Sequence, residues 1–391
     1  MRTLGLLLLT LSPVAAQPPI VQPVQPKAIP TPLGAKPITY PTDIGGKRLP
    51  DWVRDLSDRD PAVRETAIKV IPAFGPDAVL PSTRGLIARA NDEDTGVKVN
   101  AIIALGAIGA RTREEAKPIV DALKLAIANS GVGRVERLHA ARSLANYGIL
   151  ANDAISILAG ISHDPSWETR RTVAMALGRV GQVPAPAAPR VKGTDRKPKE
   201  AEMDRWTPSD KAVSTLKSMM SDDLCAQVRL EAVQSLVLLG PPEVPPELYV
   251  AAVTPLYNTV SSRLKREKDK GVLIWLVMLQ MRLNGADLSD DNIKKISDNL
   301  SDESVNVRVH ALSALGLLGD KARPALTAIA NSLQAKEPIT VAAAITCLAA
   351  LGDLSKPVIA ELLKLQAETK DETLKALATE AIKIISGAKK K

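Results

Sequence analysis

Aromatic residues are scarce in this chain of 391 residues, which has four tryptophans, four tyrosines and one phenylalanine. A sugar-binding cleft or a base-stacking groove needs several flat rings, so this shortage argues against both kinds of site. The three histidines and two cysteines leave little material for a transition-metal site held by protein ligands. From this composition we expect no metal, no cofactor and no nucleic-acid partner.

Sequence motifs of catalysis are also lacking. The histidines are followed by alanine or aspartate, never by glutamate, and no His-Glu-x-x-His or Cys-x-x-Cys occurs. The phosphate-binding loop and the Gly-x-Ser-x-Gly nucleophile motif are absent too. We therefore predict that the chain is not an enzyme.

The N-terminus has the pattern of a secretory signal peptide. Arg2 precedes an apolar run from Leu4 to Leu11, and small residues follow up to Ala16. The run is shorter than the ~20 residues that a membrane-spanning helix needs, and Pro13 interrupts it. We predict cleavage after Ala16 and export to the periplasm or the extracellular space, with no membrane span in the mature chain.

Residues 17–49 carry eight prolines and no helical period. Because proline fixes φ and offers no N–H donor, we predict an extended tether rather than a domain. The chain ends in a basic tail, residues 388–391.

A block of residues recurs throughout the remainder of the chain. One copy runs from Val97-Lys98 through Ala101 to Gly109, and another from Val307-Arg308 through Ala311 to Gly319. The intervals between the closing glycines are 34, 39, 33, 59, 45, 34, 33 and 35 residues. Such regular spacing is typical of helical repeat proteins. The closing glycines are Gly75, Gly109, Gly148, Gly181, Gly240, Gly285, Gly319, Gly352 and Gly387.

Each unit reads as two antiparallel helices, because a second apolar-periodic segment such as 119–127 precedes each block. The closing glycine suits a left-handed position beyond a helix end. No stretch alternates with period two for long enough to predict a strand. An aspartate ahead of each second helix can cap it and oppose its dipole. These aspartates are Asp60, Asp94, Asp164, Asp223 and Asp302.

The ideal unit, Asp-x-x-Val-Arg-x-x-Ala-x-x-Ala-Leu-Gly-x-Ile-Gly, resembles the short HEAT repeats, in particular the class first described in phycobilin lyases. The copies that end at Gly109, Gly181 and Gly319 are the most similar. The resemblance covers about residues 50–387 and implies an all-α, armadillo-like solenoid of about nine two-helix repeats, curved into a superhelix. The signatures of tetratricopeptide and ankyrin repeats are missing.

Three parts of the array depart from the ideal unit. Residues 184–208 are rich in proline and charge and predict a loop insertion. The segment 272–279 is apolar on all sides, which predicts a fully buried helix. The last unit is more polar than the others, as a terminal repeat must be.

Arginine or lysine recurs at one position of the repeat. We predict a structural ladder in which these side chains bond to aspartates and carbonyls between neighbouring units, in preference to a basic binding stripe. The net charge of +8 lies in the tether, in residues 260–270 and in the tail rather than along a groove, which weakens a nucleic-acid role. The ladder residues are Arg64, Lys98, Arg137, Arg170, Arg229 and Arg308.

The two cysteines, Cys225 and Cys347, lie three repeats apart within predicted helices. That separation is on the order of 30 Å for helices ~10 Å apart, which is too far for a disulfide. We predict two free, buried thiols.

One face of the second helices varies from unit to unit and is partly polar. It consists of the third, sixth and tenth positions after the Val slot, the first residue of the Val-Arg pair. In HEAT-like arrays the second helices line the concave surface, so this face is the candidate site for a protein partner. Its candidate residues are Asn100, His139, Arg142, Asn146, Thr172, Arg179, Glu231, Gln234 and His310.

These features predict an exported, non-catalytic scaffold that binds a protein along its concave face. Two alternatives stay open. One is a lyase-like protein or a carrier of a small ligand such as a tetrapyrrole, by analogy with the phycobilin lyases. The other is a structural element attached to the cell envelope through the tether and the tail.

Overall fold

The computed structural model describes residues 40–75, 80–110, 112–129, 133–184, 206–242, 246–284 and 290–387. Within these residues the chain forms nine successive two-helix units. The predicted signal peptide, residues 17–39 of the tether and the basic tail lie outside them. The predicted all-α solenoid is confirmed.

The first helices of the units are α1 (Leu49–Asp55), α4 (Thr83–Arg89), α6 (Arg113–Ala128), α8 (Ile155–Gly160), α10 (Asp210–Asp222), α12 (Pro246–Leu264), α14 (Asp290–Ser297), α16 (Leu326–Asn331) and α18 (Ile359–Glu368). The second helices are α2 (Pro61–Val70), α5 (Thr95–Ile108), α7 (Arg134–Asn146), α9 (Trp167–Val180), α11 (Ala226–Leu239), α13 (Lys270–Asn284), α15 (Val305–Gly316), α17 (Pro338–Leu351) and α19 (Glu372–Ile385). Short 3₁₀ turns connect or extend them: η1 (Ile71–Phe74), η2 (Leu80–Ser82), η3 (Gly148–Ala154), η5 (Asp298–Ser301), η6 (Gly319–Ala325), η7 (Ser332–Gln334) and η8 (Gly352–Val358).

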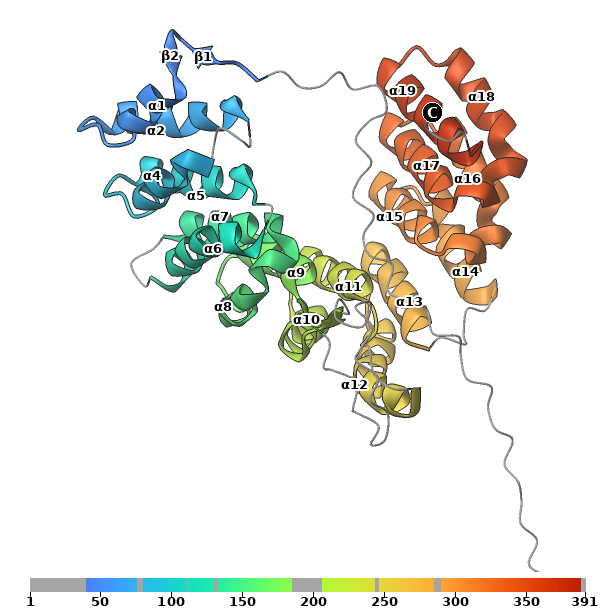
Figure 1. Cartoon of the computed structure of the whole chain (residues 1–391). Coiled ribbons are helices and arrows are strands. Elements are labelled where there is room, and N and C mark those ends of the chain that lie inside the picture. Colours follow the sequence, from blue (N-terminus) through green and yellow to red (C-terminus); the bar gives the residue numbers. More distant parts are fainter. Residues whose placement is uncertain are drawn as a thin grey trace, which may run out of the picture.

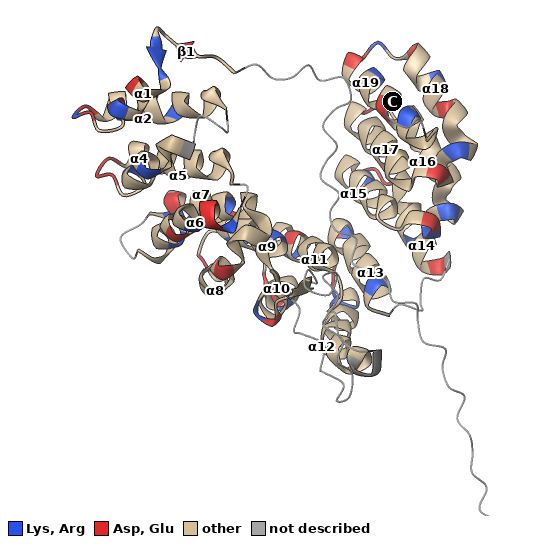
Figure 2. Ribbon diagram, viewed as in Figure 1, with Lys and Arg blue, Asp and Glu red and all other residues tan. Residues whose placement is uncertain are grey.

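The array bends into an open curve (Figure 1). The second helices, from α5 to α19, follow the inner side of this curve, whereas α8, α10, α12, α14 and α18 lie along the outer side. The side predicted to be concave is therefore the inner side of the structure. Figure 2 shows that α15 and α17 are almost free of charged residues, while α14 and α18 carry both signs.

Buried aliphatic side chains form a continuous core through all nine units, because each unit packs its apolar face against its neighbours. The apolar segment 272–279 lies in α13, where Ile274, Leu276 and Met278 are almost wholly buried. Leu273 and Val277 are half-buried, so the prediction of a buried helix is confirmed for six of the eight residues. The last helix, α19, has exposed polar residues, as predicted for a terminal unit.

Two short antiparallel ribbons correct the expectation that the chain has no strands. The first pairs β1 (Asp43–Ile44) with β2 (Lys47–Arg48) inside the segment predicted to be a tether. Its turn is Gly45-Gly46, with φ of 60° and 76°, and a type I′ hairpin turn needs positive φ at both positions. The ribbon precedes α1, where the Trp52 indole donates a hydrogen bond to the carbonyl oxygen of Ile44.

The second ribbon closes the predicted insertion. Strand β3 (Gln182–Pro184) pairs with β4 (Trp206–Pro208), so the two ends of the inserted segment lie side by side. Residues 206–208 are therefore a strand rather than a loop, and residues 185–205 lie outside the described residues.

Most closing glycines have the expected backbone conformation. Gly109, Gly319 and five others have positive φ, which confirms the prediction at those positions. Gly181 has φ of −74°, because the chain continues there into β3 instead of turning directly into the next helix. Gly285 lies outside the described residues.

Both cysteines are free thiols, as predicted. Cys347 is 3% exposed, and burial raises the pKa of its thiol to about 12. Cys225 is only half-buried, because it stands at the N-cap of α11 rather than inside the helix. The expectation of burial is correct for Cys347 and wrong for Cys225.

Among the described residues, one helical run, Pro338–Glu368, is long and apolar enough to cross a membrane by length and composition. It consists of α17, η8 and α18, and half of its apolar window is buried. The chain bends within it at Gly352, where φ is 55°. Packing within the repeat accounts for its apolar character.

Candidate functional site

The recurring arginines form the predicted ladder between units. Arg64 of α2 makes two hydrogen bonds to the carboxylate of Asp92 in the next unit, at 2.9 and 2.7 Å. Its third nitrogen, Nη1, donates to the carbonyl oxygens of Asp58 and Arg59 in its own turn. Arg64 therefore joins two units and satisfies the turn ahead of its own helix.

The same arrangement repeats along the array and confirms the ladder over a basic stripe. The arginine side chains in it are 10 to 25% exposed, too little to present a basic surface. The other pairs are Arg137–Asp164, Arg170–Asp223, Arg229–Glu267 and Arg308–Glu337. Lys98 makes no such pair among the described residues, and the turn that follows α6, residues 130–132, lies outside them.

The aspartates ahead of the second helices have two different roles. Asp60 and Asp94 are N-caps, as predicted. Asp164, Asp223 and Asp302 instead lie two residues before the N-cap and accept a hydrogen bond from its backbone N–H. The prediction of capping is wrong for these three. Each binds the side chain of a basic residue from the preceding unit.

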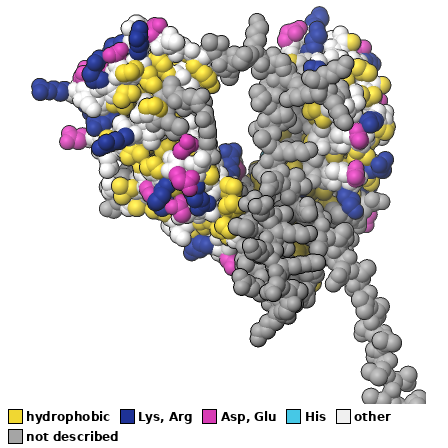
Figure 3. Space-filling model, in the orientation of Figure 1, with side chains coloured by type: hydrophobic (Ala, Val, Ile, Leu, Met, Phe, Trp, Pro, Cys, Tyr) yellow, Lys and Arg dark blue, Asp and Glu magenta, His cyan; other side chains and the backbone are white. Residues whose placement is uncertain are grey.

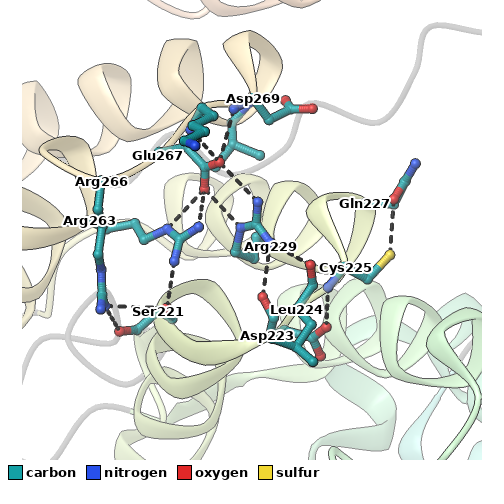
Figure 4. A network of polar contacts seen from close by, with 12 residues as sticks. Ser221, Asp223, Leu224, Cys225, Gln227, Arg229, Arg263, Arg266, Glu267 and Asp269 are labelled. Atoms are coloured by element: carbon teal, nitrogen blue, oxygen red, sulfur yellow. Dashed lines mark hydrogen bonds and ion pairs between the residues drawn. The ribbon is translucent and has the colours of Figure 1, made fainter.

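Glu267 is the centre of the densest part of the ladder (Figure 4). Its carboxylate accepts hydrogen bonds from Arg229 and Arg263 and from the backbone N–H groups of Lys268 and Asp269. Burial alone would raise its pKa, but these donors outweigh burial and lower the pKa of Glu267 to about 2. The carboxylate is thus ionised, and its hydrogen bonds hold neighbouring units of the array together.

The ladder changes chemistry at α13. Leu273 stands where α2, α7, α9, α11 and α15 have arginine, and Lys270, three residues earlier, binds Asp302 of the next unit instead. The connection between the units is kept by a different residue. This substitution was not predicted.

The predicted recognition face divides into two parts. At the third position after the Val slot, side chains are held between neighbouring helices: Asn100 donates to Glu65, and Glu231 accepts from Arg171. His310 accepts from the Trp275 indole, and Thr172 is 6% exposed. Burial, followed by the charge of Arg142, lowers the pKa of His139. Thr172 is buried and the other four are half-buried, so these side chains mainly pack one repeat against the next.

The sixth and tenth positions form a more exposed line of side chains along the second helices, which we call the inner row. Arg142 and Arg179 are exposed, as are the aliphatic residues Ile103 and Leu238. Gln234 is half-buried. The described inner row from α5 to α11, with its continuation on α15, consists of Ile103, Ala107, Arg142, Asn146, Met175, Arg179, Gln234, Leu238, Ser313 and Leu317.

Arg142 and Arg179 differ from the ladder arginines. Neither has a carboxylate partner among the residues that the structure describes. Asn146, between them along the row, uses its amide to bond the carbonyl oxygen of Gly106 at 3.1 Å. The row therefore offers two cations that no described carboxylate neutralises.

The described part of the chain has no candidate metal site. No group of three or more histidines, cysteines or acidic residues there could hold a metal ion. Two hollows of about 360 and 330 Å³ lie between units, one between α12, α13 and α14 and one at the turns ahead of α9 and α11. Neither includes a member of the inner row.

Comparison with known families identifies the repeats. Residues 49–129 and 293–383 match the family described as HEAT repeats. These two stretches are HEAT repeats. They cover the first and last units of the array, and the units between them are also pairs of helices. No curated protein matches the chain.

Two solved structures are similar in fold. A crystal structure of an engineered protein has 16% identity and a TM-score of 0.41, over 87% of this chain and 92% of its own. The complex of CpcE and CpcF of phycocyanin lyase from Nostoc sp. has 17% identity and a TM-score of 0.46, over 72% of this chain and 94% of its own. Likeness at this level concerns the general arrangement of helices and carries no functional meaning.

Proposed function

We propose that this chain is a non-catalytic scaffold that binds a protein partner along the inner row of its HEAT array. The observation that carries this proposal is the contrast between the two sets of arginines. The ladder arginines form ion pairs between units, whereas Arg142 and Arg179 are exposed beside Ile103 and Leu238 and have no carboxylate partner among the described residues. Exposed cations next to aliphatic side chains suit a protein interface, where arginine is enriched.

The site of action is part of the same proposal. The leader up to Ala16 has the basic start, short apolar core and small final residues of a cleaved signal peptide. We infer that the scaffold works outside the cytoplasm. Fractionation of the native host, with sequencing of the mature N-terminus, tests this: a chain that starts at Gln17 in an extracytoplasmic fraction is expected, and a cytoplasmic chain that starts at Met1 would contradict it.

The double variant Arg142→Ala/Arg179→Ala tests the binding surface. Removing two central interface arginines is expected to weaken capture of the partner by about 2 kcal/mol or more in total. The matched control is Lys211→Ala/Lys364→Ala, which removes two exposed cations from the outer helices α10 and α18. Equal capture by both double variants would rule out the inner row as the binding surface.

The alternative of a small-ligand carrier has its own measurement. A chain that bound a tetrapyrrole would change the visible absorption of the pigment, and a covalent adduct on Cys225 would appear by mass spectrometry. We expect neither. Release of the chain from the envelope fraction by salt would instead support attachment through its basic segments.

A further inference from the structure

We propose that the partner presents an acidic and aliphatic peptide segment to the part of the inner row that crosses α5, α7, α9 and α11. This inference rests on the proposed scaffold function and adds the chemistry of the bound segment. It predicts carboxylates opposite Arg142 and Arg179, with aliphatic side chains toward Ile103 and Leu238.

The charge of this part of the row favours an acidic segment. Arg142 lies on α7 and Arg179 on the adjacent α9, and no aspartate or glutamate belongs to the described row from α5 to α11. The acidic residues nearest to this row along the second helices are already used. Glu65 binds Lys69 and Asn100, and Glu231 binds Arg171.

Aliphatic side chains stand on both sides of the two arginines. Ile103 on α5 is 42% exposed and Leu238 on α11 is 62% exposed. Met175, on α9 between them, is half-buried and packs against the core. Along the row from α5 to α11, an aliphatic side chain is followed by two cationic ones and then by another aliphatic one. These four helices span on the order of 30 Å if neighbouring helices are ~10 Å apart.

The side chains and position of this row do not suit a nucleic acid or a membrane surface. A nucleic acid needs many phosphate contacts, and single strands also need rings for stacking, whereas the described row offers two cations and no aromatic side chain. A flat membrane surface would have to reach the inner side of a curved array, and the row lies on that side (Figure 1). Figure 3 shows hydrophobic side chains interspersed with charged ones on the N-terminal arm, a mixture suited to a peptide.

The C-terminal half of the row has a different character. Helix α13 buries Trp275 and Met278 at the corresponding positions, and its tenth-position Arg282 is half-buried and donates to the carbonyl oxygen of Val237. Helix α15 presents Ser313 and Leu317, which are uncharged. The exposed cations of the described row from α5 to α15 are therefore Arg142 on α7 and Arg179 on α9. We expect the acidic residues of the bound segment to be confined to the α7 and α9 crossing.

Selection of peptides from a random display library on the immobilised full chain tests the proposal. We expect the selected peptides to combine aspartate or glutamate with leucine, isoleucine or valine. The charge-reversed variant Arg142→Glu/Arg179→Glu is expected to bind these peptides roughly 10-fold or more weakly and to select basic peptides instead. The control Lys211→Glu/Lys364→Glu should select the same peptides as the unchanged chain, and circular dichroism verifies that all three fold.

Each other result is decisive. Selected peptides that are basic or uncharged would overturn the acidic-segment proposal but not the scaffold function. The same holds for selected peptides that bind the charge-reversed variant and the unchanged chain equally tightly. Tight binding of an oligonucleotide with no peptide selected would overturn it as well. If no peptide is selected and no protein is captured from the host, both proposals fail.

Discussion

Gly106 of α5 packs directly against Ser143 of α7. A Cβ atom at Gly106 would lie 2.8 Å from the Cα of Ser143, and the Ser143 hydroxyl donates to the carbonyl oxygen of Ile102 at 2.9 Å. The same contact recurs between Gly178 and Ser235, which occupy the same positions of later units. A missing side chain and a buried hydroxyl together set how closely these second helices approach.

Replacement of Gly106 by alanine should destabilise the array. The new methyl group would meet the backbone of α7, so the two helices would have to separate, at a cost of about 2 kcal/mol. Urea unfolding followed by circular dichroism measures the loss. Gly160→Ala is the control, since nothing lies within 4 Å of a Cβ there, and it should be neutral or stabilise by up to about 1 kcal/mol.

Cys347 takes the place of the serine in a third pair, opposite Gly316. Cys347→Ser should therefore be tolerated, because Ser143 and Ser235 already occupy this position, and its hydroxyl can donate to the carbonyl of Leu312. We expect a change in unfolding free energy within about 1 kcal/mol. The larger Cys347→Leu should destabilise by about 2 kcal/mol through overpacking. Equal tolerance of both variants would contradict the packing of Cys347 against α15.

Glu267→Gln should cause a large loss of stability. It removes the charge that compensates Arg229 and Arg263 at a site where the Glu267 side chain is 1% exposed. Breaking a buried pair from one side costs about 3 kcal/mol. Asp121→Asn removes an exposed carboxylate from α6 and should change stability by no more than about 0.5 kcal/mol. If the two substitutions had similar effects, Glu267 would not be a central support of the array.

The ladder also predicts how stability depends on pH. The pKa of Asp92 and Asp223 is below its ordinary value, since the bonds from Arg64 and Arg170 outweigh the opposing effect of burial, and that of Glu267 is about 2. Carboxylates with lowered folded-state pKa stabilise the fold above their unfolded-state value, about 4, and that contribution is lost as pH falls through the folded value. The urea midpoint should stay level from pH 7 to about 5 and fall between about 4.5 and 2. Glu267→Gln should show a shallower decline, and a midpoint unaffected at low pH would contradict the ladder.

Much of the fold could be predicted because the same residue pattern occurs many times in the sequence. The period, the two helices of each unit and the arginine ladder all follow from residues that recur at fixed positions. The ribbon at Asp43–Arg48 could not be predicted in this way, since two-residue strands are too short to show a period of two. Its only local signal is Gly45-Gly46, within a segment dominated by prolines.

The candidate surface could be predicted only in part. Helical spacing placed Asn100 and Glu231 on the same face as Arg142 and Arg179. The period of a single helix does not reveal which edge of that face the next helix covers, because this depends on how neighbouring helices cross. The structure places the third position under that edge and leaves the sixth and tenth positions more open. Only this arrangement shows that Ile103 and Leu238 are exposed members of the inner row.

Site-specific photocrosslinking in the native host tests the central claim most directly. A photoreactive residue would replace Ala107 or Leu238 of the inner row in one set of chains, and Lys211 or Lys364 of the outer helices in another. The account predicts that both inner positions link to the same protein and that the outer positions do not. Capture of no protein at the inner positions, or equal capture of that protein at the outer ones, would contradict a scaffold that binds through its concave face.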